Sequence, residues 1–121
     1  MPTACGGGVG PVDGPVTALI VRGMVQDQSG AAVTGAEVRA AWRPWWCGEL
    51  QDFPPDTSTA EGEFEVWLSE WGEFPAACVR VLAVPPPDRE LQSASLQLDR
   101  VPFERRVGAD TLALRLTLPA P

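Results

Sequence analysis

The sequence predicts an all-β fold, a two-layer antiparallel Greek-key β-sandwich of about seven strands. Three observations support this. Apolar and polar residues alternate with a period of two in several short segments, as in half-buried strands. The 121 residues include 13 Pro and 12 Gly, about twice the usual share, which favours turns over long helices. Turn signals also recur between the alternating segments, as expected for a sandwich of short strands.

The first half of the domain contains two clear strands. From Thr17 onward, Leu19, Val21 and Val25 alternate with more polar neighbours, and the cluster 27–30 then forms a turn. The segment Ala36–Trp42 alternates in the same way. Arg43–Pro55 is rich in Pro and is expected to be a long loop.

Strand character returns in the second half of the chain. The expected strands are Asp56–Thr59, Glu63–Leu68, Cys78–Val84 and Thr111–Leu118. Asp88–Val101 fits a helical stripe as well as a strand, and a strand is favoured. Together the alternating positions predict one core, made of Val21, Val25, Val38, Trp42, Phe64, Val66, Val81, Leu114 and Leu116.

The composition divides the chain into a tether, residues 1–16, and a domain, residues 17–121. Residues 1–16 are rich in Gly and Pro and have too few large apolar groups to fold alone. Small residues that end in Cys5, followed by three Gly, resemble the cleavage box of a bacterial lipoprotein, which makes Cys5 a candidate for lipidation. An ordinary flexible N-terminus with a chance Cys is the alternative. No apolar run is long enough to predict a transmembrane span.

Cys47 and Cys78 are predicted to form a disulfide. A single pair in a small, loop-rich domain is typical of an oxidising compartment, and it points to an extracytoplasmic location in the cell envelope or outside the cell. Two separate buried thiols are the alternative. A catalytic thiol is disfavoured, since the chain has no His to activate it.

One set of residues resembles a known family. Val21–Asp27, then Gly30, Val33 and Gly35–Val38, followed by Thr59–Phe64, are similar to the carboxypeptidase regulatory-like domain. The resemblance implies a transthyretin-like sandwich, and it implies a non-catalytic module attached to other proteins. In such a sandwich the elements that carry Cys47 and Cys78 lie close enough for a bridge. The Trp-rich loop after Trp42 departs from the family's plainest members.

Composition excludes several kinds of chemistry. The formal net charge of −7 and the lack of a basic block argue against nucleic-acid binding. His, Lys and Tyr are all absent, so imidazole bases and Schiff-base lysines are not available. The acidic stretch that includes Glu63 and Glu65 fits a solvated strand face. We therefore expect no catalytic residues, no metal and no cofactor, and the sequence predicts that the protein is not an enzyme.

The sequence is unusual in containing five Trp residues in so small a domain. Trp42 is in phase with the core. Trp45, Trp46 and Trp67 are candidates for ligand binding because exposed indoles stack on sugars or anchor partners, although packing of the loop Trp over the disulfide is favoured. The expected function is thus a structural or protein-interaction module with an unknown protein or glycan partner. A carbohydrate-binding module is the alternative.

Overall fold

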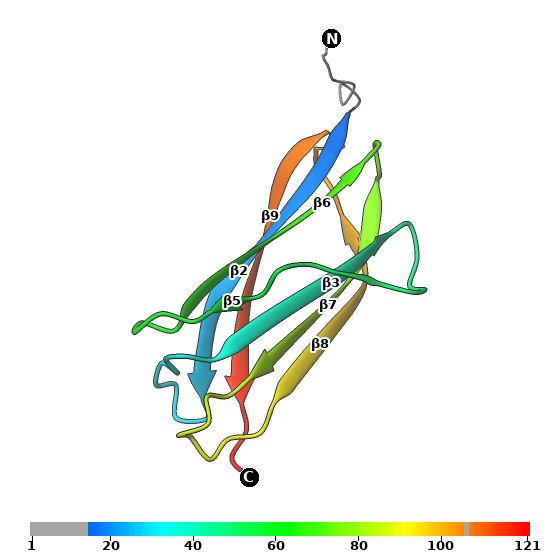
Figure 1. Ribbon diagram of the computed structural model, residues 1–121. Helices are drawn as coiled ribbons and strands as arrows, with labels where there is room; N and C mark the ends of the chain where they lie inside the picture. Colours follow the sequence, from blue (N-terminus) through cyan, green and yellow to red (C-terminus); the bar gives the residue numbers. More distant parts are fainter. Residues whose placement is uncertain (1–14, 106) are drawn as a thin grey trace.

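The computed structural model describes residues 15–105 and 107–121. All helical or strand-like secondary structure in this part of the chain is β-strand (Figure 1). The all-β prediction is therefore confirmed. The strands are β2 (Val16–Asp27), β3 (Glu37–Pro44), β4 (Gln51–Asp52), β5 (Asp56–Thr57), β6 (Glu63–Trp71), β7 (Ala76–Val84), β8 (Ala94–Pro102) and β9 (Gly108–Leu118).

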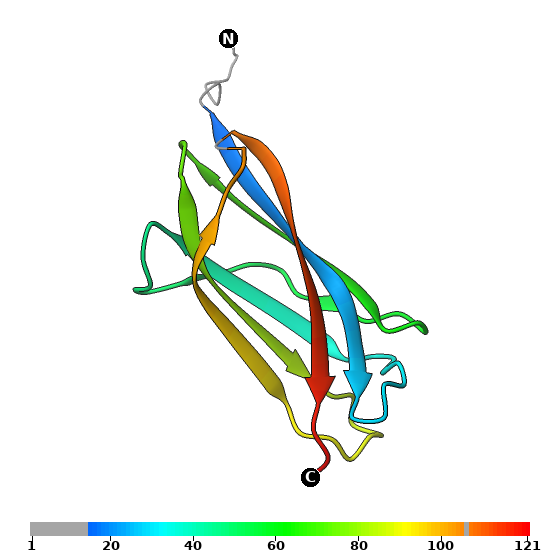
Figure 2. The same ribbon diagram turned by 180° about the vertical axis from the view of Figure 1, so that it is seen from behind.

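The strands form the two layers of a sandwich, seen from opposite sides in Figures 1 and 2. One sheet has the order β6-β2-β9. The other has the order β4-β3-β7-β8, with β5 also paired to β3. Within the described residues no helix is present that is long and apolar enough to cross a membrane.

One strand pair departs from the antiparallel prediction. β2 and β9 are parallel, whereas every other pair of strands is antiparallel. The reason lies in the route of the chain. β8 ends in one sheet, and after a short crossing the chain enters the other sheet with Gly108 beside Thr17, at the start of β2. The two strands then run in the same direction.

The core follows the alternation of the sequence. In β6, buried positions alternate strictly with exposed ones, so Phe64, Val66 and Leu68 face the opposite sheet. Eight of the nine expected core residues are buried, and Leu114 is only partly buried because β9 is an edge strand. Trp42 is the largest fully buried side chain, at 1% exposure. The apolar period therefore located the core correctly.

Several expected boundaries shift. β3 continues to Pro44, and β4 (Gln51–Asp52) lies inside the segment expected to be a loop. Pro hides a strand end from sequence reasoning because it cannot donate a ladder hydrogen bond, yet it is tolerated at such ends. The ambiguous segment forms β8, a strand. β2 already starts at Val16, one residue inside the expected tether; the rest of that tether up to residue 14, including Cys5, lies outside the described residues.

Gly23 has a structural role that alternation alone does not reveal. A Cβ atom built at this position would lie 1.7 Å from the backbone oxygen of Leu114. The backbone of β9 therefore passes so close to β2 that only a residue without a side chain fits there. This close approach helps to explain how the last strand joins the first.

Buried polar groups fasten the connections between strands. Ser58 Oγ donates to the Val33 carbonyl at 2.7 Å and accepts from the Ala36 N–H at 2.9 Å. At the other end of the sandwich, Thr17 Oγ1 donates to the Gly72 carbonyl at 2.7 Å. The second bond fixes the turn that follows Trp71, which lies next to the site described below.

Candidate functional site

Aromatic side chains line a cleft beside the end of β3, and we call it the aromatic cleft. Its volume is about 400 Å³, which is within the range of small-molecule sites. Its walls come from the end of β3 and the loop after it, from β4, from the end of β6 and from the β6–β7 connection. It is lined by Trp42, Arg43, Pro44, Trp45, Trp46, Glu49, Gln51, Glu70, Trp71 and Phe74.

Three of the indoles in this cleft are only half covered by protein. Trp45, Trp46 and Trp71 are 49%, 59% and 50% exposed. Large apolar side chains that gather in one hollow while remaining exposed are unusual on a soluble surface and often mark a binding site. About half of each of Trp45 and Trp46 faces solvent and is open to a ligand, and their expected packing over the disulfide stays a prediction.

Trp45 occupies a strained backbone conformation. Its φ of 79° makes it the only residue other than Gly with a positive φ among the described residues, and a bulky residue rarely adopts this conformation. Its N–H donates to the Ala76 carbonyl at 3.0 Å, and its ring meets Phe74 edge-on with centroids 6.0 Å apart. Such strain costs about 1–3 kcal/mol and concentrates at functional sites. Here it places an indole in the wall of the cleft.

Arg43 and Trp46 form the second fixed pair. The Arg43 guanidinium carbon lies 5.0 Å from the centre of the Trp46 ring, within cation–π range. Arg43 Nη1 also donates to the Glu49 carbonyl at 3.2 Å, which closes the loop on itself. A Cβ at Gly48 would meet both side chains at 3.2–3.3 Å, so the absence of a side chain there leaves room for the stack.

The structure joins Cys47 to Cys78 by a disulfide, with their Cα atoms 5.1 Å apart. Cys78 is fully buried on the central strand β7, whereas Cys47 is exposed in the loop directly after Trp46. A loop with few apolar anchors of its own is thereby attached to the sheet. The bond restricts the part of the chain that carries both Trp45 and Trp46.

The buried side of the cleft holds an unsatisfied donor. Trp42 lines the cleft, and its indole Nε1 is buried without a hydrogen-bond partner among the described residues. Leaving such a donor unpaired costs about 1–3 kcal/mol. Its ring packs against Phe53 and Phe103, with centroids 6.1 and 6.0 Å away, so the indole cannot turn freely to find a partner.

The structure brings together only two of the three candidate Trp residues. Trp67 is 56% exposed on the outer side of β6, where its Nε1 donates to Glu65 Oε1 at 2.9 Å, and it does not line the aromatic cleft. Sequence reasoning missed Trp71, Phe74 and Arg43. The available signal was the pair of aromatic residues that flanks Gly72, because aromatic residues beside a turn are well placed to line a loop-built site.

A larger hollow lies beside β2 and β6, but it offers less for binding. It measures about 510 Å³, and its lining includes Arg22, Asp56 and Glu65. These charged groups already contact one another or the backbone. Arg22 lies 3.3 Å from Glu65, and the Glu65 N–H donates to Asp56 Oδ2 at 2.7 Å. The aromatic cleft is therefore the better candidate site.

Asp27, which lies outside the cleft, has a shifted pKa. The pKa of Asp27 falls below its ordinary value of 3.8. The main cause is the hydrogen bond from the Ser29 hydroxyl, partly opposed by desolvation, with help from the N–H groups of Ala31 and Ser29 and from nearby Arg89. These donors favour the charged carboxylate. Asp27 thus stabilises the turn after β2 and takes no part in the site.

Comparison with known proteins indicates the class of fold. No family model and no curated protein matches the chain, so the resemblance to the carboxypeptidase regulatory-like domain stays a prediction. Among solved structures, the chain is similar to 3-chlorocatechol 1,2-dioxygenase from Rhodococcus opacus, with a TM-score of 0.59 and 16% identity over 92% of this chain and 62% of that one.

Two other structures are similar to the same degree. A mutant of catechol 1,2-dioxygenase from Acinetobacter radioresistens gives a TM-score of 0.59 and 12% identity over 88% of this chain and 53% of that one. The dioxygenase domain of a dioxygenase–carbohydrate-binding protein fusion from a cellulolytic Streptomyces gives 0.58 and 17%, over 92% of this chain and 85% of that domain. The chain spans only half to two thirds of the length of the first two.

These structures correct the functional expectation. A non-catalytic module, and no enzyme, was expected from the sequence, yet several solved structures with a similar fold are dioxygenases. The error has a physical origin. Missing His, Lys and Tyr exclude particular roles for this chain's own side chains, but they do not exclude a part in the substrate site of an enzyme. At identities of 12–17%, the likeness itself establishes the fold alone.

The residues of this chain do not fit an oxygen-activating iron centre. Non-haem iron oxygenases commonly use imidazole together with a carboxylate, and the chain contains no His. Among the described residues, one group of Cys, Asp and Glu side chains lies close enough to hold a metal, namely Cys47, Cys78 and Asp99, and both sulfurs are in the disulfide.

Proposed function

We propose that this chain is the substrate-binding β-sandwich of a dioxygenase-type enzyme, and that it binds a small planar aromatic compound of the catechol class in the aromatic cleft. The observation that carries the proposal is the convergence of Trp45, Trp46 and Trp71 with Phe74 around one cleft of about 400 Å³. The catechol class follows from the substrates named for the dioxygenases of similar fold.

The walls of the cleft suit a flat ring. Indole faces stack on planar π-systems, and each such contact adds about 0.5–1.5 kcal/mol beyond the burial of apolar area. Trp45 is held in place by its N–H bond to the Ala76 carbonyl and by Phe74, and Trp46 is held by Arg43. Because these rings are fixed before a ligand arrives, binding loses little side-chain entropy.

The polar groups at the cleft suit hydroxyl substituents. Glu49, Glu70 and Gln51 line the cleft and offer oxygen acceptors for hydroxyl protons. Arg43 also lines the cleft, and its guanidinium N–H groups are donors for a ligand oxygen. Neighbouring hydroxyls on one ring could therefore both donate and accept. Groups that react with oxygen would come from outside the residues of this chain.

Calorimetric titration with catechol tests the proposal, using two Trp of nearly equal exposure. Trp46→Ala should weaken binding about tenfold, which is the loss expected for one stacking contact. Trp67→Ala is the matched control, since Trp67 is about equally exposed but lies outside the cleft. This variant should bind catechol as tightly as the wild type.

Two further ligands sharpen this test. Cyclohexane-1,2-diol carries the same two hydroxyls without a planar π-system, so it should bind much more weakly than catechol. Cellobiose should not bind. Equal losses in the two Trp variants, or binding of cellobiose in preference to catechol, would overturn the proposal.

The location of the protein is also a proposal. The disulfide supports an oxidising, extracytoplasmic compartment, and the residues around Cys5 support a lipid anchor. Mass spectrometry of the protein from its native cells tests the anchor. An acyl modification on Cys5 is the expected result, and a free Cys5 thiol in the mature protein would contradict it.

A further inference from the structure

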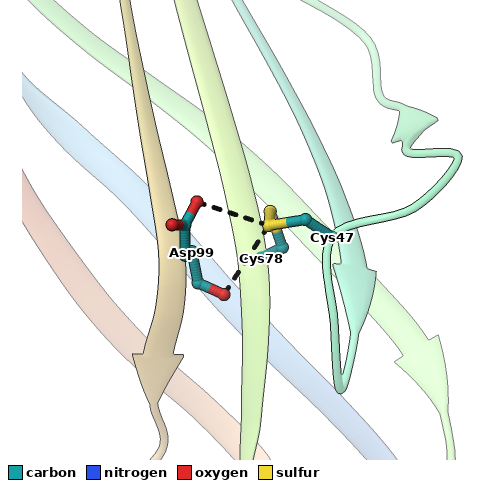
Figure 3. A group of neighbouring side chains, drawn as sticks. All are labelled: Cys47, Cys78 and Asp99. Atoms are coloured by element: carbon teal, nitrogen blue, oxygen red, sulfur yellow. Dashed lines mark hydrogen bonds between the residues drawn. A yellow bond between two sulfur atoms is a disulfide. The ribbon is translucent and has the colours of Figure 1, made fainter.

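A carboxylate lies next to the Cys47–Cys78 disulfide, although a disulfide needs no charged neighbour. Asp99, on β8, places its Oδ1 3.5 Å from the sulfur of Cys47 (Figure 3). A sulfur in a disulfide has no proton to donate, so this contact joins two groups that both carry lone pairs. The carboxylate, the exposed Cys47 and the buried Cys78 have ligand atoms that all lie within 4.8 Å of one another.

The separation between the sulfur and the oxygen is the one that zinc would set. With a Zn–S distance of about 2.3 Å and a Zn–O distance of about 2.1 Å, tetrahedral zinc holds these two ligand atoms about 3.6 Å apart. The observed 3.5 Å matches this value. The two sulfurs would have to separate to about 3.8 Å, and Cys47 lies in an exposed loop that can allow this movement.

A neighbouring side chain supports Asp99. Gln97 Nε2 lies 3.2 Å from Asp99 Oδ1 and 3.7 Å from the Cys47 sulfur. Outer hydrogen bonds of this kind orient the ligands of metal sites and raise metal affinity. Gln97 therefore fixes the direction in which the carboxylate faces the two sulfurs.

We propose that Cys47, Cys78 and Asp99 form a zinc site when the disulfide is reduced. A dithiol reductant transfers two electrons and two protons to the bond, which gives two thiols and leaves the reductant as its own disulfide. Zinc then displaces both thiol protons, so that two thiolates and one carboxylate bind it and two protons are released. Water would fill the fourth position, as in open zinc sites.

The donor set favours zinc over other divalent ions. Thiolates select soft or borderline metals, whereas calcium and magnesium need six or more oxygen ligands or near-octahedral geometry. A bound zinc ion would also keep the loop of Trp45 and Trp46 attached to β7 after the covalent link is lost. The proposal does not depend on what the aromatic cleft binds.

Cobalt(II), added to protein that has been reduced and freed of reductant, is the spectroscopic probe for this site. The expected result is one Co²⁺ per chain, with a sulfur-to-cobalt charge-transfer band and tetrahedral visible bands, both lost when Zn²⁺ is added. The oxidised protein should show neither. Asp99→Asn should weaken binding more than about 100-fold, the upper limit for loss of an outer partner, whereas Asp52→Asn, which alters a carboxylate outside this cluster, should not.

Each other outcome counts against the site. Absence of the bands in the reduced protein, equal binding by Asp99→Asn, or equal binding by the oxidised protein would overturn the proposal. If the reduced apoprotein proves to be unfolded, then Zn²⁺ should restore its β-sheet circular dichroism, because metal binding would then drive folding. Failure of zinc to restore it would also overturn the proposal.

Discussion

Two regions of this molecule expose indoles, and they do so in different ways. Trp67 is outward-facing because it occupies an exposed position in the regular alternation of β6. Trp45 and Trp46 are presented by a loop that needs a strained residue, a cation–π contact and a disulfide to hold them. The exposed fractions are alike, yet only the second region forms a cleft. Exposure alone does not make a site; convergence of constrained side chains does.

The largest expected effect on stability comes from a change in the hydrophobic core, which supports both regions. Phe64→Ala removes a buried ring next to β2 in the three-stranded sheet and should lower the free energy of unfolding by about 3–5 kcal/mol. Urea denaturation measures this change. A loss below about 1 kcal/mol would show that Phe64 is not central to the core, contrary to its 4% exposure.

The next largest effect separates the two regions. Replacing both Cys47 and Cys78 with Ala opens a loop with a sequence separation of 31 residues, and it should cost about 3.5 kcal/mol of stability in the chain-entropy model. Binding of catechol should weaken as well, since the loop that carries Trp45 and Trp46 loses its anchor.

The surroundings of Trp67 serve as the control for this double variant. The indole N–H signal of Trp67 in a ¹⁵N-correlated NMR spectrum should change little, because Trp67 lies outside the cleft and neither Cys47 nor Cys78 is on β6. Equal disturbance of both regions, or unchanged catechol binding, would contradict the role given to the disulfide.

A smaller effect tests the strain at Trp45. Trp45→Gly places at φ 79° a residue that adopts this conformation freely. The gain in backbone energy should offset part of the lost contact with Phe74, so stability should change by less than about 1 kcal/mol, while catechol affinity falls about tenfold.

Trp45→Ala is the comparison that isolates the strain. It loses the same indole but keeps a side chain in the unfavourable conformation, so it should be less stable than Trp45→Gly by up to about 1 kcal/mol. Thermal unfolding measures the difference. Greater stability of the Ala variant would show that the backbone is not strained at this position.

The smallest effect concerns pH and lies away from both indole regions. The pKa of Asp27 is lower in the folded protein than its ordinary value of 3.8, so its contribution to stability is fully present above pH 3.8 and is lost as the pH falls through the lower, folded value. Asp27→Asn should therefore be less stable than the wild type near neutral pH, and the difference should shrink in acid. Urea denaturation of both proteins near neutral pH and again below the folded pKa of Asp27 tests this. An equal difference in stability at both pH values would contradict it.

The strands and the hydrophobic core could be predicted from the sequence, whereas the aromatic cleft could be predicted only in part. Period-two alternation located β2, β3, β6 and β9 and the core, because a strand with one buried face alternates in this way, and the Val-rich run located β7. The parallel pairing of β2 with β9 was missed, since it depends on where the chain crosses between sheets.

The cleft depends on features that no period encodes. The positive φ of Trp45, the stack of Arg43 on Trp46 and the approach of Trp71 all arise from tertiary contacts. Composition also misled the functional inference. The absence of His, Lys and Tyr was taken to exclude an enzyme, although binding a ring needs only aromatic walls and a few polar groups.

The central claim, that the aromatic cleft binds a planar aromatic compound, is tested most directly by the indole N–H signals of the five Trp residues in a ¹⁵N-correlated NMR spectrum. Each indole gives one signal, so the spectrum reports on both regions at once. On titration with catechol, we expect the signals of Trp45, Trp46 and Trp71 to shift together with that of Trp42, while the signal of Trp67 stays in place. A shift of the Trp67 signal alone, or no shift at saturating catechol, would contradict the account.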